Sequence, residues 1–158
     1  MAGKRLAGMG YAVWILAAGL AVWGAQGLLE AAEGESKVVA ARKKVMQGNN
    51  KAFKAIQEAA KADKYGIILV QGSEIAENAM EIPDAFEKKD LSGKTRALPK
   101  IWEEKDKFKQ IASKLMADAR ALEEAAQNKD KEKVTAAFKA LGATCDACHK
   151  DYRAERKE

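Results

Sequence analysis

Apolar residues recur three and four positions apart in four segments of the chain, and this spacing constrains the fold more than any other feature. It is the period of an α-helix with one buried face. The segments cover about residues 35–62, 68–83, 99–128 and 134–152. On the first segment, the residues that share this face are Val38, Arg42, Val45 or Met46, Asn49, Phe53 and Ile56.

The composition supports a helical fold. The 158-residue chain has 2 Pro and 12 Gly, too few turn residues for a β-sandwich or barrel. Its length suits one domain of ordinary size. Two of the connections between the four segments are short, and the longest covers residues 84–98. We therefore predict an all-α fold: an antiparallel four-helix bundle over residues 30–158, preceded by an additional N-terminal hydrophobic helix.

The N-terminal segment is typical of an export signal. Lys4 and Arg5 precede an apolar run over residues 11–29, which has no charge before Glu30. A basic start followed by an apolar stretch directs a chain out of the cytoplasm, and the small residues at 25–27 would suit cleavage. The run also approaches the roughly 20 residues that can span a bilayer. We predict that residues 1–29 are a signal peptide or a membrane anchor, and that the remainder is periplasmic, either soluble or tethered to the inner membrane by residues 11–29.

One motif in the chain carries recognisable chemistry. Cys145, Cys148 and His149 form the pattern C-x-x-C-H, which is typical of c-type haem attachment. Two thiols on one helical turn can add to the two vinyl groups of a porphyrin, and the adjacent imidazole can bind the iron as the proximal ligand. The chain has no other Cys and no other His. The motif therefore predicts one covalently attached haem c.

Three other interpretations of the motif are weaker. A thioredoxin-type redox pair would be expected beside a βαβ pattern, which the sequence lacks. A zinc site would need a fourth ligand that is neither Cys nor His. A disulfide between Cys145 and Cys148 is the third interpretation. Outside the motif we find no nucleophile–base pair or metal cluster, so we predict an electron carrier or gas-binding haem protein and no enzyme.

The position of the motif resembles one family of cytochromes. A four-helix chain with C-x-x-C-H near its C-terminus, here within residues 142–153, is similar to the class II cytochromes c. These are the cytochromes c′ and their low-spin, methionine-ligated relatives of the cytochrome c-556 type. The segment Arg42-Lys43-Lys44-Val45-Met46 resembles the family's first helix, and residues 99–102 resemble the entry to its third helix. The resemblance covers residues from about 35 to the C-terminus.

The resemblance places Met46 at the family's distal position. A methionine thioether is the usual second axial ligand where no second histidine is available. We therefore predict that His149 and Met46 bind the iron; the alternative is that Met46 is a core side chain that covers the iron without bonding it. The matching arginine of the family lies near a haem propionate. This implies that Arg42 contributes to cofactor binding, whereas a solvated surface arginine is the alternative.

These assignments lead to three functional hypotheses. The first is a periplasmic monohaem carrier that transfers single electrons to redox partner proteins. The second is a five-coordinate cytochrome c′ that binds nitric oxide or carbon monoxide at an open iron. The third is a membrane-tethered haem subunit of a respiratory or photosynthetic complex. Apolar faces on the first two helices would also allow a homodimer. The net charge of +5, on 28 basic and 23 acidic residues, is too even to indicate nucleic-acid binding.

Overall fold

The computed structural model describes residues 36–155. The predicted signal or anchor over residues 1–29 lies outside this part of the chain, as does the beginning of the predicted haem domain, so both stay predictions. The described residues form helices α1 (Lys37–Lys61), α2 (Tyr65–Ala85), α3 (Lys100–Glu103), α4 (Lys105–Gln127) and α5 (Lys131–Tyr152). Among them, no helix is both long and apolar enough to cross a membrane.

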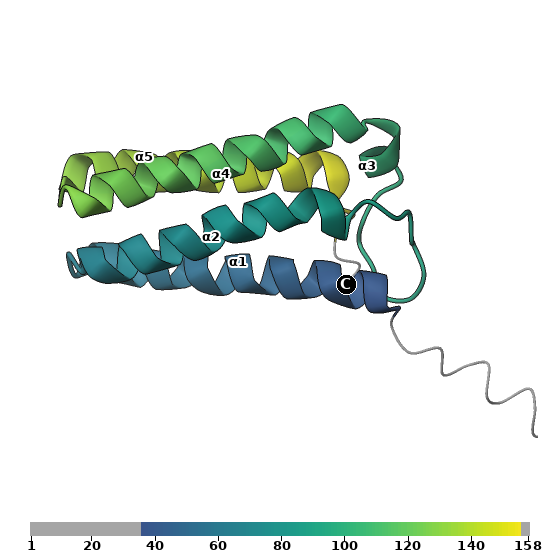
Figure 1. Ribbon diagram of the computed structural model, residues 1–158, viewed down its shortest axis with the longest axis horizontal. Helices are drawn as coiled ribbons and strands as arrows, with labels where there is room; N and C mark the ends of the chain where they lie inside the picture. The colour runs from purple at the N-terminus through teal and green to yellow at the C-terminus, as the bar shows by residue number, and fades with distance from the viewer. Residues whose placement is uncertain (1–35, 156–158) are drawn as a thin grey trace, which may run out of the picture. The chain divides into compact units, whose positions relative to one another are not determined.

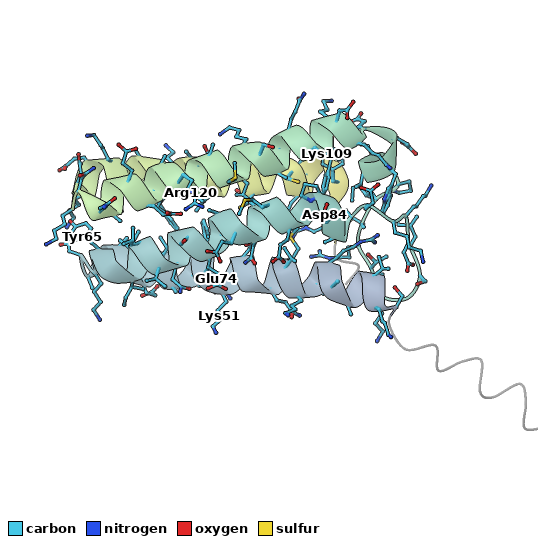
Figure 2. All side chains as sticks on the ribbon, in the orientation of Figure 1. Lys51, Tyr65, Glu74, Asp84, Lys109 and Arg120 are labelled. Carbon is cyan, nitrogen blue, oxygen red and sulfur yellow. The ribbon has the colours of Figure 1, made fainter. Side chains whose placement is uncertain are left out.

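The four long helices form the predicted bundle. α1 and α2 lie side by side as one antiparallel pair, and α4 and α5 form the other (Figure 1). α2 also packs closely against α4, whereas α1 and α5 approach each other in few places. Charged side chains such as that of Lys51 extend from the outside of the helices (Figure 2). The sparse packing between α1 and α5 leaves space inside the bundle, and the functional site lies there.

Local side-chain signals account for the starts of two helices and for one turn. The Ser36 hydroxyl accepts a hydrogen bond from the Val39 N–H at 3.1 Å, which caps α1. The Asp130 carboxylate caps α5 by accepting from the Lys133 N–H at 3.0 Å. Between α1 and α2, Asp63 has a φ of 51°, a left-handed conformation that an Asp side chain tolerates in a turn. These caps place the ends of α1 and α5 near the predicted positions.

Several predicted helix boundaries differ from the structure: α2 and α5 each begin three residues before the predicted segments, and two further differences have a clear local cause. α2 continues two residues beyond Pro83, because a proline near the end of a helix removes one hydrogen bond without stopping the last turn. The predicted helix from Pro99 to about residue 128 is divided at Glu104, whose φ of −118° and ψ of 45° are not helical. The short α3 covers one end of the bundle, where Ile101 is buried.

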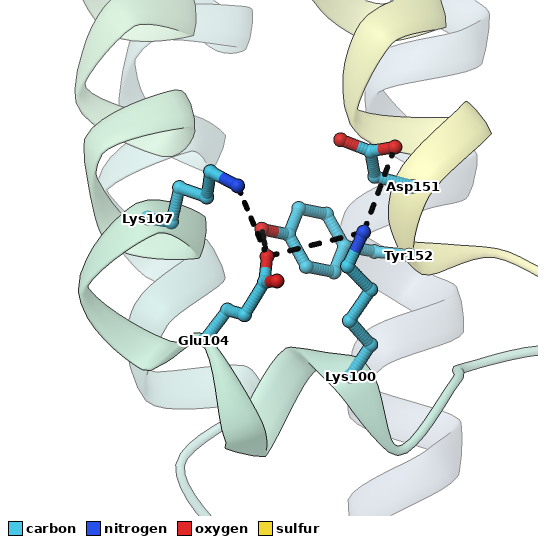
Figure 3. Close-up of polar contacts among 5 residues, drawn as sticks. All are labelled: Lys100, Glu104, Lys107, Asp151 and Tyr152. Atoms are coloured by element: carbon cyan, nitrogen blue, oxygen red, sulfur yellow. Dashed lines mark hydrogen bonds and ion pairs between the residues drawn. The ribbon is translucent and has the colours of Figure 1, made fainter.

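Polar contacts around Glu104 join α3, α4 and α5 (Figure 3). The Tyr152 hydroxyl donates to Glu104 Oε2 at 2.9 Å, and this bond lowers the pKa of Glu104. Burial and the same carboxylate raise the pKa of Tyr152 to about 12. Lys100 Nζ lies 3.9 Å from Glu104 Oε2 and 3.8 Å from Asp151 Oδ1. This cluster fixes the C-terminal end of α5, which is the end that carries the C-x-x-C-H motif.

The core lies between the helix pairs and consists of aliphatic side chains. Ile56, Ile68, Leu122 and Leu141 are fully buried. At the crossing of α2 and α4, a Cβ atom on Gly72 would lie 3.1 Å from the Glu123 Cγ, so this glycine permits the close approach of the two helices. The apolar periodicity thus correctly predicted which faces pack together.

Candidate functional site

A cavity of about 360 Å³ lies inside the bundle. Residues of α1, α2, α4 and α5 line it, so every long helix contributes a wall. Most of the wall is apolar, with Phe53 from α1, Ile75 and Ile82 from α2, and Phe108 and Leu115 from α4. Such a space suits a flat, largely apolar ligand held by a few polar groups.

The C-x-x-C-H motif supplies the α5 wall of this cavity. Cys145, Cys148 and His149 all line it, on the last turns of the helix. Both cysteines are free thiols and are half-buried. Burial is the main cause that raises the pKa of Cys145, and it raises that of Cys148 to about 11. The two thiols are therefore protonated at neutral pH, which is the form that carries the hydrogen added to a vinyl group.

The surroundings of His149 favour the neutral form of its imidazole, which is the form that binds a metal. Burial lowers the pKa of the imidazole, and the positive charge of Arg153 lowers it further. A neutral imidazole has a free nitrogen lone pair, which is the form that coordinates iron. The structure thus brings a neutral imidazole and two thiols to one cavity wall.

Met46 lies on the α1 wall of the same cavity. It is half-buried, and the apolar face predicted for α1 carries it there. Among the described residues, the other two methionines do not line the cavity: Met80 is 53% exposed on α2, and Met116 packs against the core from α4. The structure therefore brings Met46 together with the motif, although the two are far apart in sequence.

Arg42 occupies a different place from the other predicted site residues. It is buried on α1 but is not among the residues that line the cavity. Its guanidinium donates to the main-chain oxygens of Ala85 at 3.0 Å and Asp90 at 2.7 Å, and also to that of Lys88. These three acceptors belong to the end of α2 and the loop after it. Arg42 is thus neither a solvated surface residue nor part of the cavity wall.

Sequence reasoning missed the side chains that anchor the motif. Thr144, directly before Cys145, is buried, and its hydroxyl donates to Asp118 Oδ2 on α4 at 2.6 Å. Lys114 Nζ contacts both oxygens of the same carboxylate, at 2.8 and 2.7 Å. The sequence signal that could have indicated this contact is a polar residue, Thr144, on the buried face of α5 next to Cys145. The bond fixes the position of α5 against α4 next to the first thiol.

Replacing Thr144 with valine is expected to lower the free energy of unfolding by about 1–3 kcal/mol. Valine has the same shape but leaves the Asp118 carboxylate without its buried donor. Urea denaturation monitored by circular dichroism would measure the change. Thr135→Val is the matched control, since that hydroxyl is exposed and donates only to the Lys131 carbonyl of its own helix. Equal effects of the two substitutions would contradict an anchoring role.

The residues present fit a covalently attached haem. The donor set is two thiols and an imidazole within one helical turn, and the remaining wall is mainly apolar, as a porphyrin face requires. Within residues 36–155, no group of three or more His, Cys, Asp and Glu side chains is placed to hold a bare metal ion. The two thiols, the imidazole and the apolar wall together match an iron held in a porphyrin.

Comparison with known proteins supports this interpretation. Residues 37–153 match the sequence model of the cytochrome C′ family. The chain belongs to the cytochrome c′ family. It binds one covalently attached haem c, and members of the family are electron carriers or gas-binding haem proteins rather than classical enzymes.

Individual relatives agree with the family assignment. Cytochrome c-556 from Agrobacterium tumefaciens (strain II Chrys) is 37% identical over 113 residues, which are 72% of this chain and 91% of the relative. Cytochrome c′ from Rhodopseudomonas palustris is 34% identical over 126 residues, or 77% and 85% of the two chains. A solved structure of a cytochrome c′ from Rhodopseudomonas palustris superposes with a TM-score of 0.68 at 30% identity, covering 78% of this chain and all of that one. The predicted family and four-helix architecture are therefore confirmed.

Proposed function

We propose that this cytochrome carries single electrons through a haem attached to Cys145 and Cys148, with His149 and Met46 as the axial ligands of the iron. The observation that carries the proposal is the position of Met46: it lies on the α1 wall of the cavity whose α5 wall is the C-x-x-C-H motif. An iron with imidazole and thioether ligands changes oxidation state with little rearrangement. The protein contributes ligands, burial and orientation, and the haem supplies the redox chemistry.

The proposal assigns a distinct task to each helix. α5 holds the two thiols and the unprotonated imidazole, and the Thr144–Asp118 bond fixes their position. α1 brings the thioether from the other pair of helices. α2 and α4 supply apolar side chains such as Ile75 and Phe108, which keep water away from the macrocycle. The haem domain begins near residue 30, after a leader that directs it to the periplasm.

A second candidate is a five-coordinate cytochrome c′ that binds nitric oxide or carbon monoxide. It is supported by the relatives, which include proteins named cytochrome c′ as well as cytochrome c-556. In this case Met46 would cover the iron without bonding it, and its flexible side chain would move aside for a ligand. The two candidates share the cofactor and His149 and differ only at Met46.

The partners that we propose follow from the outer surface. An electron carrier must meet redox partner proteins, and encounter is faster between complementary charges. The exposed lysines of α4, such as Lys105 and Lys109, are candidates for contact with an acidic partner. Ile67 and Val70 leave apolar surface on the outside of α2, which is compatible with a homodimer.

Replacing Met46 with alanine tests the proposal. The wild-type protein is expected to have a sharp α band when reduced and the weak iron–methionine charge-transfer band when oxidised. The variant should lose the charge-transfer band, become high-spin, and bind carbon monoxide readily, because the iron would lack its sixth ligand. Absorption spectra of both oxidation states, with and without carbon monoxide, measure this. Met116→Ala is the control, and identical spectra of wild type and Met46→Ala would refute ligation.

A further inference from the structure

Asp118 is an acidic residue at the edge of the buried face of α4. It lies one turn after Leu115, which lines the cavity, and one turn before Leu122, which is fully buried. Its side chain is only 15% exposed. Carboxylates are rarely withdrawn from water to this extent, because the charged form loses its hydration. The place of Asp118 between apolar residues therefore needs a physical explanation.

Both oxygens of the Asp118 carboxylate have partners, and the partners differ in exposure. The Thr144 hydroxyl donates to Oδ2 at 2.6 Å, and Lys114 Nζ lies 2.7 Å from Oδ2 and 2.8 Å from Oδ1. Thr144 is buried on α5, whereas the Lys114 side chain is 60% exposed. Water therefore screens the ammonium more than the carboxylate, and the negative charge dominates on the side of the pair that contacts α5.

The contact with Thr144 does not itself require a charge. The carbonyl oxygen of an asparagine has almost the same position and accepts the same hydrogen bond. Ion pairs that are withdrawn from water add little to stability, because the cost of desolvation offsets the attraction. Stability therefore accounts for a hydrogen-bond acceptor at position 118, but not for a negative charge there.

The Asp118 carboxylate lies beside the attachment point of the haem. Thr144 directly precedes Cys145 in the chain, so the bond to Thr144 holds the carboxylate next to this cysteine. Burial raises the pKa of the Cys145 thiol, and the negative charges of Asp146 and Asp118 raise it further. Asp146 is exposed, whereas Asp118 is sheltered from solvent. The charge of Asp118 therefore acts on the sulfur that carries the haem, with less screening by water.

We propose that Asp118 is a redox-tuning residue, whose carboxylate favours the oxidised haem and lowers its midpoint potential. When the iron accepts one electron from a redox partner, the haem gains one negative charge, and a nearby carboxylate opposes this change. Thr144 holds the carboxylate in position, and the ammonium of Lys114 moderates its effect. The inference rests on the proposed function, because it concerns the electron that the haem carries, but it does not require a bond between Met46 and the iron.

The midpoint potentials of the holoproteins test the proposal, measured by redox titration followed in the visible absorption spectrum. Asp118→Asn keeps an acceptor for Thr144 and removes the charge. It is expected to shift the one-electron equilibrium toward the reduced haem by about tenfold, which is a rise of ~59 mV in the midpoint potential. Asp106→Asn is the matched control, since it removes an exposed carboxylate from the same helix and should shift the potential much less. Lys114→Gln removes the counter-charge and should lower the potential.

Thr144→Val separates the charge of Asp118 from its structural contact, because it breaks the hydrogen bond and keeps the carboxylate. It should not raise the midpoint potential. The proposal would be overturned if Thr144→Val raised the potential as much as Asp118→Asn, or if Asp118→Asn shifted it no more than Asp106→Asn. Should Asp118→Asn fail to fold, an unchanged or raised potential in Lys114→Gln would overturn it instead. The iron–methionine band is recorded in the same samples, and its absence would contradict ligation by Met46 without affecting these comparisons.

Discussion

Arg42→Met is expected to lower the free energy of unfolding by about 3–5 kcal/mol, more than any other single substitution considered for this protein. Methionine keeps an unbranched apolar stem of similar length but removes the guanidinium. Three main-chain oxygens, at the end of α2 and in the loop after it, would then lose a charged donor. Because these acceptors are partly buried, water could replace the donor only at a cost.

The contacts of Arg42 explain the size of this effect. The last carbonyls of a helix have no partner within the helix, and Arg42 Nε fills this role for Ala85. The guanidinium carbon also lies 4.9 Å from the centroid of the Phe86 ring and 5.0 Å from that of Trp102. Such contacts between a cation and aromatic rings add to the hydrogen bonds. Burial lowers the pKa of Arg42 from its ordinary value, and Asp90 opposes this shift.

Urea denaturation of the holoprotein would measure the decrease in the free energy of unfolding of Arg42→Met. Arg120→Met is the matched control, since Arg120 is exposed and forms an ion pair with Glu123 of its own helix; its substitution should cost less than about 1 kcal/mol. The loss of free energy of unfolding in Arg42→Lys should lie between those of Arg42→Met and Arg120→Met. The lysine ammonium keeps the charge but cannot reproduce the planar set of donors of the guanidinium. A loss in Arg42→Met no larger than that of Arg120→Met would contradict the structural role.

The double substitution Cys145→Ala, Cys148→Ala is expected to abolish covalent haem. Each thiol forms one thioether bond under our proposal, and the chain has no other cysteine that could replace them. The variant, expressed in a host competent in haem attachment, should release all of its haem on extraction with acidified acetone. Mass spectrometry of the intact chain would measure the same loss.

The two single substitutions serve as controls for the double one. Cys145→Ala and Cys148→Ala should each keep one thioether bond, and therefore extraction-resistant haem. The double variant should also unfold at a lower temperature, since a cavity of about 360 Å³ with mainly apolar walls would lose its covalent occupant. Haem that stays with the double variant after extraction would contradict attachment through this motif.

Two properties of the site illustrate what sequence patterns can predict. The C-x-x-C-H motif is local: a single helical turn determines where its thiols and imidazole lie, so the cofactor was predictable from five residues. Met46 required the family resemblance as well, because periodicity placed it on the apolar face of α1 without indicating that this face meets the motif. Its bond to the iron stays a prediction until spectra are measured.

Other features escaped the sequence patterns because they depend on residues far apart in the chain. An arginine on an apolar face gives no sign that three carbonyls of a later segment will meet it. Likewise, nothing near Thr144 indicates that Asp118 will accept its hydroxyl. The break at Glu104 also arises at the bundle end, where the side chain meets Tyr152. Each of these contacts joins residues that only the packing of the helices brings together.

The sequence by itself determined the helical fold, its buried faces and its cofactor, because periodicity, caps and a one-turn motif act over a few residues. The tertiary structure alone decided how the helices pair. It separated α1 from α5 enough to leave a cavity, brought Met46 and Asn49 to the wall beside His149, and placed Arg42 outside the cavity. The physical reason is that burial of apolar faces selects the packing, and packing then determines which polar groups find partners.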